Sequence, residues 1–416
     1  MTESIAKRFA VNLLGNSATQ LAQALVPLLT LPYLARTVGL EGLGQIALAQ
    51  VFIAYFALMA DFGIGALATR DATTNKSNSR RLHEIVIEVL IARALLALGV
   101  TPFLIYCVAA FEPLRAHWEL YLATSGLVIA AVLNTNWLYQ GLERMLFYAR
   151  IALISRLIGV ALTFLLVKDS KDLIIVPAIN VSVEISIGII GYVALQAQKN
   201  GIPITSSVLA GAKNYIRSSS RMFFSQLLVN VYGSTNSLVL GLVAPVAELG
   251  AFTIANKIFS ALAAFANLIT QAIFPYLVER YNEERAKYFV HANRLIVLLG
   301  IVLSIFSIGL FVFAETLIHL VNGTPNVSAT MSLQIMAPAA VMSGFGGLLT
   351  YLTVLHTSLG ALMRAVTVGA AISLATVFPA ASEFGAPGVA FVTVLSQAVV
   401  VCLLFWWFKR QQADYV

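Results

Sequence analysis

Three basic residues lie deep inside long apolar runs of this sequence, namely Arg93, Arg156 and Lys257. Ionisable residues at such positions are costly in a membrane and usually serve a function. Guanidinium and ammonium groups suit phosphate, because both are charged donors and arginine can bind two oxygens at once. Arg217 and Arg221 lie at the start of a further apolar run. Together the five residues predict an anion-binding interior; the alternative is that some of them, Arg156 and Arg221 above all, extend to the membrane surface.

Acidic residues inside the apolar runs are fewer. Glu184 lies near the middle of its run, and Asp61 lies near the end of another. Glu184 has two interpretations: it binds a coupling ion, H+ or Na+, or it is the structural counter-ion of Arg156 or Arg93. Asp61 is the second candidate for ion coupling. No other cofactor is expected, and no metal site is predicted, because none of the five histidines lies deep in a run beside another ligand.

Two of the apolar runs carry a polar stripe along one helix face. The members of each stripe follow one another at spacings of four, four and three residues: Asn12, Asn16, Gln20 and Gln23 in the first, and Gln226, Asn230, Ser234 and Ser237 in the second. An amide that faces lipid is costly, so both stripes must face protein or water. Hydrogen bonding between helices is one interpretation. Because both halves of the chain carry a stripe, we favour a hydrated cavity in which the six amides contact substrate.

The composition identifies the class of protein. Of 416 residues, 59% are hydrophobic and 11% are charged, whereas soluble domains carry about 45–50% apolar and about 25% charged residues. These values exclude a soluble enzyme, a secreted disulfide scaffold and a disordered chain. No GxxxxGKS or GxxxxGKT motif occurs, so no ATP site is expected. The net charge of +7 is explained by anionic membrane lipid, and no nucleic-acid partner is expected.

Runs of about 20 apolar residues predict membrane-spanning helices. About twelve such runs predict an all-α polytopic membrane protein, with spans near residues 10–35, 44–67, 84–110, 117–140, 149–167, 173–196, 214–243, 249–277, 290–313, 329–355, 361–381 and 386–408. Most of the 26 lysines and arginines then lie in loops on the side of the N-terminus, and the opposite loops hold only Arg36, Arg115, Lys168 and Lys171. This bias predicts that both termini are cytoplasmic.

An internal repeat relates the two halves of the chain. Leu43–Gln50 resembles Leu249–Asn256 at a shift of 206 positions, with Leu, Gly and Ala matching in place. An even number of spans separates the copies, which predicts parallel repeats related by an axis along the membrane normal. We therefore expect two six-helix bundles, over residues 1–198 and 214–416, joined by a cytoplasmic linker over residues 199–213.

Several motifs resemble the polysaccharide biosynthesis protein family, the Wzx-type O-antigen flippases of the MATE-like exporter superfamily. The motifs that carry the resemblance are Leu29–Arg36 with Gly42-Leu43-Gly44, Ala60–Gly63, Asn136–Glu143, Arg217–Arg221 with Phe223–Gln226, Glu248–Gly250 with Ala255–Lys257, and Phe274-Pro275. They cover residues from about 10 to 280, and Asn136–Glu143 is the most specific of them.

The resemblance implies a flippase in the bacterial plasma (inner) membrane, not an enzyme. It would move undecaprenyl-pyrophosphate-linked oligosaccharide repeat units from the inner to the outer leaflet by alternating access, through a cationic cavity. The implied partners are the lipid-linked oligosaccharide, membrane lipid, and a polysaccharide polymerase with its chain-length regulator.

Three rival functions remain open at this stage. An ion-coupled antiporter for drugs or organic cations, from the same superfamily, would need an acidic cavity. A polytopic polysaccharide polymerase or ligase would need a sizeable outer loop, and the predicted outer loops are short. The third rival is a passive lipid scramblase or an assembly scaffold.

Overall fold

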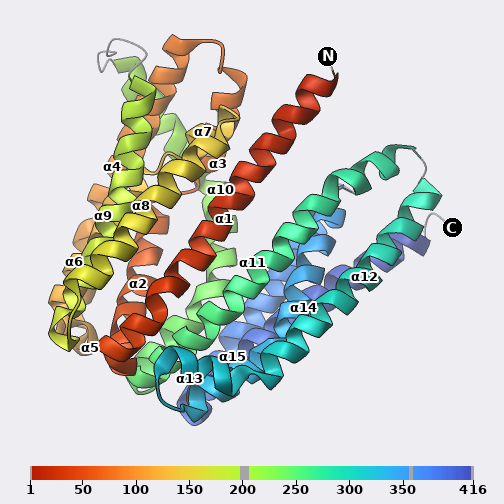
Figure 1. The fold of residues 1–416 in the computed structure, drawn as a ribbon. Helices are drawn as coiled ribbons and strands as arrows, with labels where there is room; N and C mark the ends of the chain where they lie inside the picture. Colours follow the sequence, from red (N-terminus) through yellow and green to blue (C-terminus); the bar gives the residue numbers. More distant parts are fainter. Residues whose placement is uncertain (1, 197–205, 284, 356–358, 414–416) are drawn as a thin grey trace. The chain divides into compact units, whose positions relative to one another are not determined.

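In a computed structural model the described residues, which are 2–196, 206–283, 285–355 and 359–413, form helices joined by short turns and contain no strand (Figure 1). The helices of the first half are α1 Thr2–Thr37, α2 Gly39–Asp61, α3 Ile64–Thr74, α4 Ser79–Ala110, α5 Glu112–Arg115, α6 Trp118–Leu133, α7 Asn136–Gly141, α8 Met145–Leu166, the 3-10 turn η1 Ser170–Ile174 and α9 Ile175–Gln196. Those of the second half are α10 Ser206–Val243, α11 Val246–Glu283, α12 Arg285–Val312, α13 Ala314–Asn322, α14 Val327–Leu355 and α15 Leu359–Ala413.

Nine helical segments of the described residues are long and apolar enough to cross a membrane. Helices α1 and α10, which carry the two polar stripes, fall outside this set. Helix α15 counts once, although Gly385 interrupts it with non-helical backbone and divides it into two arms. These arms correspond to the predicted spans 361–381 and 386–408. The prediction of an all-α polytopic membrane protein is confirmed.

The chain forms two compact units, which we call unit 1 and unit 2. Unit 1 contains Met1–Val26 and Leu48–Leu227, and unit 2 contains Pro27–Ala47 and Leu228–Val416. Helices α1, α2 and α10 therefore contribute residues to both units. The predicted bundle limits at residues 198 and 214 stay a prediction.

The predicted linker over residues 199–213 stays a prediction, but part of it is helical. Residues 197–205 lie outside the described part of the chain, and Ser206–Lys213 form the first turns of α10. These turns pack on unit 1, because Ala212 and Tyr215 lie in the same apolar core as Ile64, Val89 and Trp137. Val208 and Ala212 form the buried face of these turns, and Leu209, Ala210 and Lys213 are exposed.

Two predicted spans of unit 1 are broken rather than continuous. The run 44–67 is divided between α2 and α3 at Phe62 and Gly63, whose φ angles are 50° and 72°. Glycine adopts this left-handed backbone without a steric penalty. The run 117–140 is divided between α6 and α7 at Asn134, whose backbone is extended. Both breaks interrupt the helical hydrogen-bond ladder inside an otherwise apolar segment.

Helix α10 covers the first of these breaks. The rings of Phe62 and Phe223 stack with their centroids 4.4 Å apart, and Met222 packs on Gly63. Further toward its start, the Tyr215 hydroxyl donates a 2.6 Å hydrogen bond to the Asp71 carboxylate on α3. These contacts hold the α2–α3 junction in a fixed shape, which positions the polar site described below.

Unit 2 is built around α11, α12, α14 and α15, which pack side by side (Figure 1). Its core includes the fully buried Leu277, Tyr288, Leu348 and Leu352. Glu248 on α11 stabilises the kink of α15, because its carboxylate accepts a 3.0 Å hydrogen bond from the backbone N–H of Ala386. A carboxylate at the start of a helical arm satisfies an otherwise unpaired donor.

The internal repeat has a direct structural counterpart in unit 2. Gly44 packs against the backbone carbonyl of Val246, and Gly250 packs against the backbone carbonyl of Leu40. Each pair of residues is related to the other by the same shift of 206 positions. A methyl group on either glycine would overlap the facing carbonyl oxygen, so the close crossing of α2 and α11 depends on both.

Candidate functional site

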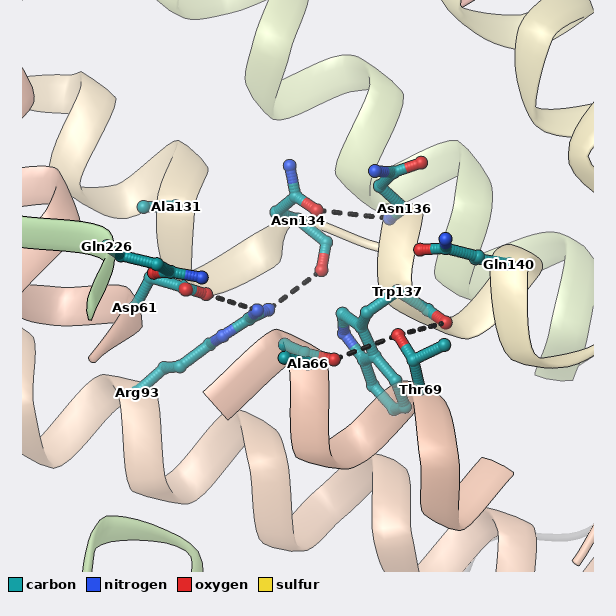
Figure 2. Close-up of a pocket in the computed structure, with 11 residues that line it drawn as sticks. Asp61, Ala66, Thr69, Arg93, Ala131, Asn134, Asn136, Trp137, Gln140 and Gln226 are labelled. Atoms are coloured by element: carbon teal, nitrogen blue, oxygen red, sulfur yellow. Dashed lines mark hydrogen bonds and ion pairs between the residues drawn. The ribbon is translucent and has the colours of Figure 1, made fainter. Parts of the chain in front are cut away.

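The central feature of unit 1 is a buried arginine. Only 2% of the Arg93 side chain is exposed. One terminal nitrogen donates to the Asp61 carboxylate, and the other donates a 2.9 Å hydrogen bond to the backbone carbonyl of Asn134 (Figure 2). A buried guanidinium requires such partners, because removing a charge from water without compensation is strongly unfavourable.

Both partners of Arg93 come from the helix breaks. Asp61 is the last residue of α2, directly before the left-handed Phe62 and Gly63. The Asn134 carbonyl becomes available because α6 ends there. Carbonyls released by interrupted membrane helices commonly bind cations or polar groups, since no helical donor reaches them.

The second break is stabilised by its own side chains. The Asn134 Oδ1 accepts a 3.0 Å hydrogen bond from the backbone N–H of Asn136, which begins α7. On α3, the Thr69 hydroxyl lies 3.2 Å from the Trp137 carbonyl, and the Thr73 hydroxyl lies 3.3 Å from the Gly141 carbonyl. Helices α3 and α7, which follow the two breaks, are thereby held together.

Arg93 and Asp61 line a polar cavity with a volume of about 370 Å³. The amides of Asn136, Gln140 and Gln226 line it, and Figure 2 shows Gln226 beside Asp61. Gly65 keeps the cavity open next to the ion pair, because a methyl group there would lie 3.1 Å from a terminal nitrogen of Arg93. A charged donor, an acid and several amides therefore share one cavity.

This arrangement is suited to binding an anion that also carries hydroxyl groups. The guanidinium can exchange its bond to the Asp61 carboxylate for a bond to a phosphate oxygen. The planar carboxylate and the tetrahedral phosphate are both oxyanions that can accept two hydrogen bonds from arginine. The surrounding amides offer both donors and acceptors. Asp61 is partly exposed, with 25% of its side chain accessible, and Arg93 is not, so the acid is the partner that water reaches.

The structure brings together three of the residues predicted from the sequence, namely Arg93, Asp61 and Gln226. It places a second ion pair elsewhere in unit 1, between Arg156 on α8 and Glu184 on α9, at 2.9 Å. Of the two interpretations of Glu184, the geometry therefore matches the counter-ion of Arg156. Glu88 on α4 does not pair with Arg93; it binds Arg81 at 2.7 Å.

The remaining candidates are spread over both units and outside this cavity. Lys257 and Asn230 are half-buried in unit 2. In unit 1, Arg217, Arg221 and Gln23 are exposed, Asn16 and Gln20 are half-buried, and the side chain of Asn12 lies outside the described part of the chain. Their assignment to substrate binding stays a prediction.

Sequence reasoning assigned no role to several cavity residues, above all Asn134, Asn136 and Gln140. The sequence does indicate a helix break here, because Asn134-Thr135-Asn136 places residues that favour helix caps and turns inside an apolar run. Ala60–Gly63 indicates the other break in the same way, because it places aspartate and glycine inside an apolar run. In the part of the chain that the structure describes, no three His, Cys, Asp or Glu side chains gather closely enough to hold a metal ion.

Comparison with known proteins identifies the family. Residues 9–281 match the model of the polysaccharide biosynthesis protein family. The chain belongs to this family. Residues 222–378 also match the MatE family model.

Two curated relatives match almost the whole chain. Both carry the name "Putative O-antigen transporter". The protein of Escherichia coli (strain K12) is 24% identical over 96% of this chain and 97% of its own length. That of Shigella dysenteriae is 27% identical over 92% of this chain and 96% of its own length.

Solved structures share the fold. The lipid II flippase MurJ, in an inward closed conformation, superposes with a TM-score of 0.74 at 13% identity, covering 98% of this chain and 87% of that chain. An inward-facing multidrug resistance MATE family transporter gives 0.67 at 15% identity, covering 93% and 95%. These neighbours have a two-lobe fold of 12 helices. Family and fold together indicate a multi-pass membrane transporter of the flippase or MATE type rather than an enzyme.

Proposed function

We propose that this polysaccharide biosynthesis family member flips undecaprenyl-pyrophosphate-linked oligosaccharide repeat units, of an O-antigen or a related surface polysaccharide, from the inner to the outer leaflet. It would act by alternating access in the bacterial plasma membrane, with both termini in the cytoplasm. The observation that carries the proposal is the buried Arg93 at two helix breaks, open to an amide-lined cavity. The relatives named for O-antigen transport support the substrate class.

The chemistry of the substrate explains why such a cavity is needed. A pyrophosphate with attached sugars cannot enter hydrocarbon, because its charges and hydroxyls would lose their hydration. Arg93 would replace water at the pyrophosphate, and Asn136, Gln140 and Gln226 would replace water at nearby hydroxyls. The isoprenoid tail can stay in lipid throughout.

Asp61 provides a route to ion coupling in this proposal. While Asp61 is ionised it holds Arg93, and protonation of Asp61 would release the guanidinium for pyrophosphate. Removal of the flipped product by a polymerase and its chain-length regulator would also give the transport a net direction toward the outer leaflet. Both acids pair with an arginine, but only Asp61 lines the cavity, so we assign proton coupling to Asp61 first.

The test is a gene deletion complemented with Arg93→Ala. We expect complete lipid-linked repeat units to accumulate on the cytoplasmic side, inaccessible to a membrane-impermeant glycosidase, while the variant protein remains in the membrane. Arg80→Ala is the matched control, because Arg80 is an exposed arginine at the start of α4, the helix that also carries Arg93. Full export by Arg93→Ala would overturn the proposal. Accumulation of single units on the outer side would indicate a polymerase or ligase instead.

The second candidate is an ion-coupled drug or organic-cation antiporter. The MatE match over residues 222–378 and the fold of the MATE neighbour favour it, whereas the buried Arg93 beside the cavity opposes it, because it would repel an organic cation. This function predicts that the deletion strain loses resistance to organic cations and keeps its surface polysaccharide intact. The same strain therefore decides between the two candidates.

A further inference from the structure

A second polar pocket lies in unit 1 where the α3–α4 and α7–α8 turns meet. Its volume is about 240 Å³. The side chains that line it are of two kinds. Lys76, Ser79, His83 and Arg144 are basic or carry a hydroxyl, and Leu82, Leu142 and Leu195 are apolar. It shares no residue with the Arg93 cavity.

The two turns are held together by direct contacts, so the pocket is a built feature of the fold. Lys76 binds Glu143 across the turns at 2.8 Å. The Thr73 hydroxyl, at the end of α3, donates a hydrogen bond to the Gly141 carbonyl at the end of α7. Only one carboxylate, that of Glu143, pairs with the cations of the pocket among the described residues, and it is taken by Lys76.

His83 points to a missing ligand. Its Nδ1 lies 2.7 Å from the Ser79 carbonyl, and because a carbonyl only accepts, Nδ1 carries the proton. The other ring nitrogen, Nε2, is buried and has no hydrogen-bond partner in the part of the chain that the structure describes. Buried polar atoms are almost always bonded. When the ring is charged, Nε2–H is a donor to an anionic oxygen placed in the pocket.

The positive charge around the pocket has further sources. Arg144 is exposed and has no ion-pair partner among the described residues. Ser79 begins α4, and Arg144 is the N-cap of α8, so two helix N-termini line the same pocket. The N-terminus of a helix carries partial positive charge that favours anions, phosphate in particular.

We propose that this pocket binds the phosphate group of an anionic lipid headgroup from the adjacent leaflet. The turns that form it belong to the arginine-rich segments that the positive-inside bias places on the cytoplasmic side. Its leucines suit the glycerol end of a headgroup, and its cations suit the phosphate. A soluble diphosphate shares the same chemistry and is the other source. The proposal does not depend on the flippase function.

The test uses the full-length protein in detergent, with lipid binding followed by native mass spectrometry. The probes are phosphatidylglycerol, phosphatidylcholine and inorganic pyrophosphate. We expect preferential binding of phosphatidylglycerol, weakened about tenfold in Arg144→Ala, because one charge-assisted hydrogen bond is lost. His83→Asn should weaken binding as well, since the asparagine amide can keep the bond to the Ser79 carbonyl but has no counterpart of Nε2. Arg80→Ala, a neighbouring exposed arginine outside the pocket, should leave it unchanged.

Each result has one meaning. Equal losses in Arg144→Ala and Arg80→Ala would show unspecific attraction and overturn the proposal, as would binding of none of the probes. Binding of pyrophosphate alone, lost in the same two pocket variants, would assign the pocket to a soluble ligand and overturn the lipid source. The unfolding midpoint of each variant, measured without lipid, shows whether the variant keeps the fold. If Arg144→Ala is destabilised, the lipid binding of His83→Asn decides whether the proposal holds.

Discussion

The two units solve the problem of burying polar groups in different ways. In unit 1, Arg93 and Asp61 form an ion pair beside an open cavity. In unit 2, the buried Asn236 on α10 is held by two hydroxyls from the two arms of α15: it donates to Thr393 at 3.0 Å and accepts from Ser373 at 2.7 Å. Both clusters lie near helices that are interrupted, at Gly63 and Gly385 respectively.

The difference indicates which unit can respond to a ligand. The Asn236 cluster is neutral, and its amide oxygen and nitrogen are both bonded, so it favours one rigid arrangement. The Arg93 pair is charged, and the Nε atom of Arg93 has no partner among the described residues. An anion or a proton therefore changes the energy of the unit 1 site by much more than that of the unit 2 cluster.

Neutralising the unit 1 pair is expected to have the largest effect on stability. Asp61→Asn leaves the buried Arg93 charge uncompensated, which should lower the free energy of unfolding by about 3 kcal/mol. Adding Arg93→Met should recover most of this loss, because no charge then remains buried. Denaturant unfolding in detergent measures both variants. If Asp61→Asn is as stable as the parent protein, the pair does not stabilise unit 1.

Removing Asn236, the central residue of the unit 2 cluster, should lower the free energy of unfolding by less. Asn236→Ala leaves the Ser373 and Thr393 hydroxyls without this partner, at an expected loss of about 1–3 kcal/mol in unfolding free energy. Export in the deletion strain should stay close to normal, in contrast to Arg93→Ala. Loss of export at full stability would show that the unit 2 cluster also acts in transport, and the contrast between the units would fail.

The crossing of α2 and α11 gives a test inside unit 2. Gly250→Ala places a methyl group against the Leu40 carbonyl and should destabilise the protein by about 1–3 kcal/mol through overpacking. Gly44→Ala should match it, because the repeat makes the two contacts equivalent. Gly309→Ala is the control, since a methyl group there meets open space. Unequal effects of the two crossing glycines would contradict the equivalence.

The smallest effect is expected at the surface of unit 1. Lys76→Ala removes an ion pair with Glu143 in which both side chains are about 40% exposed. Such pairs contribute about 0–1 kcal/mol, and salt screens them. The unfolding free energy of this variant should therefore approach that of the parent protein at high salt. A large, salt-independent loss would mean that the two turns depend on this pair.

Several features followed from the sequence alone. Composition and the spacing of apolar runs indicated a polytopic helical membrane protein, because a chain with so little charge cannot cover a soluble surface. The internal repeat at a shift of 206 positions was also found in the sequence, although its contacts at Gly44 and Gly250 were seen only in the structure. The spacing of five residues between Glu88 and Arg93 predicts that they do not pair and that each finds a partner on another helix. Arg93 does so, because Asp61 lies on α2, but the prediction is wrong for Glu88, which binds Arg81 on its own helix, α4.

Other features were decided only by the tertiary structure. Hydropathy is a property of a local window, so it treated residues 44–67 and 117–140 as continuous spans and missed breaks that tertiary contacts of Phe62, Gly63 and Thr69 stabilise. Partner choice is likewise non-local: Glu184 had two possible arginines by sequence, and the packing of α8 on α9 selected Arg156. The breaks free the carbonyl and carboxylate that bind Arg93, which is why its surroundings emerged only from the folded chain.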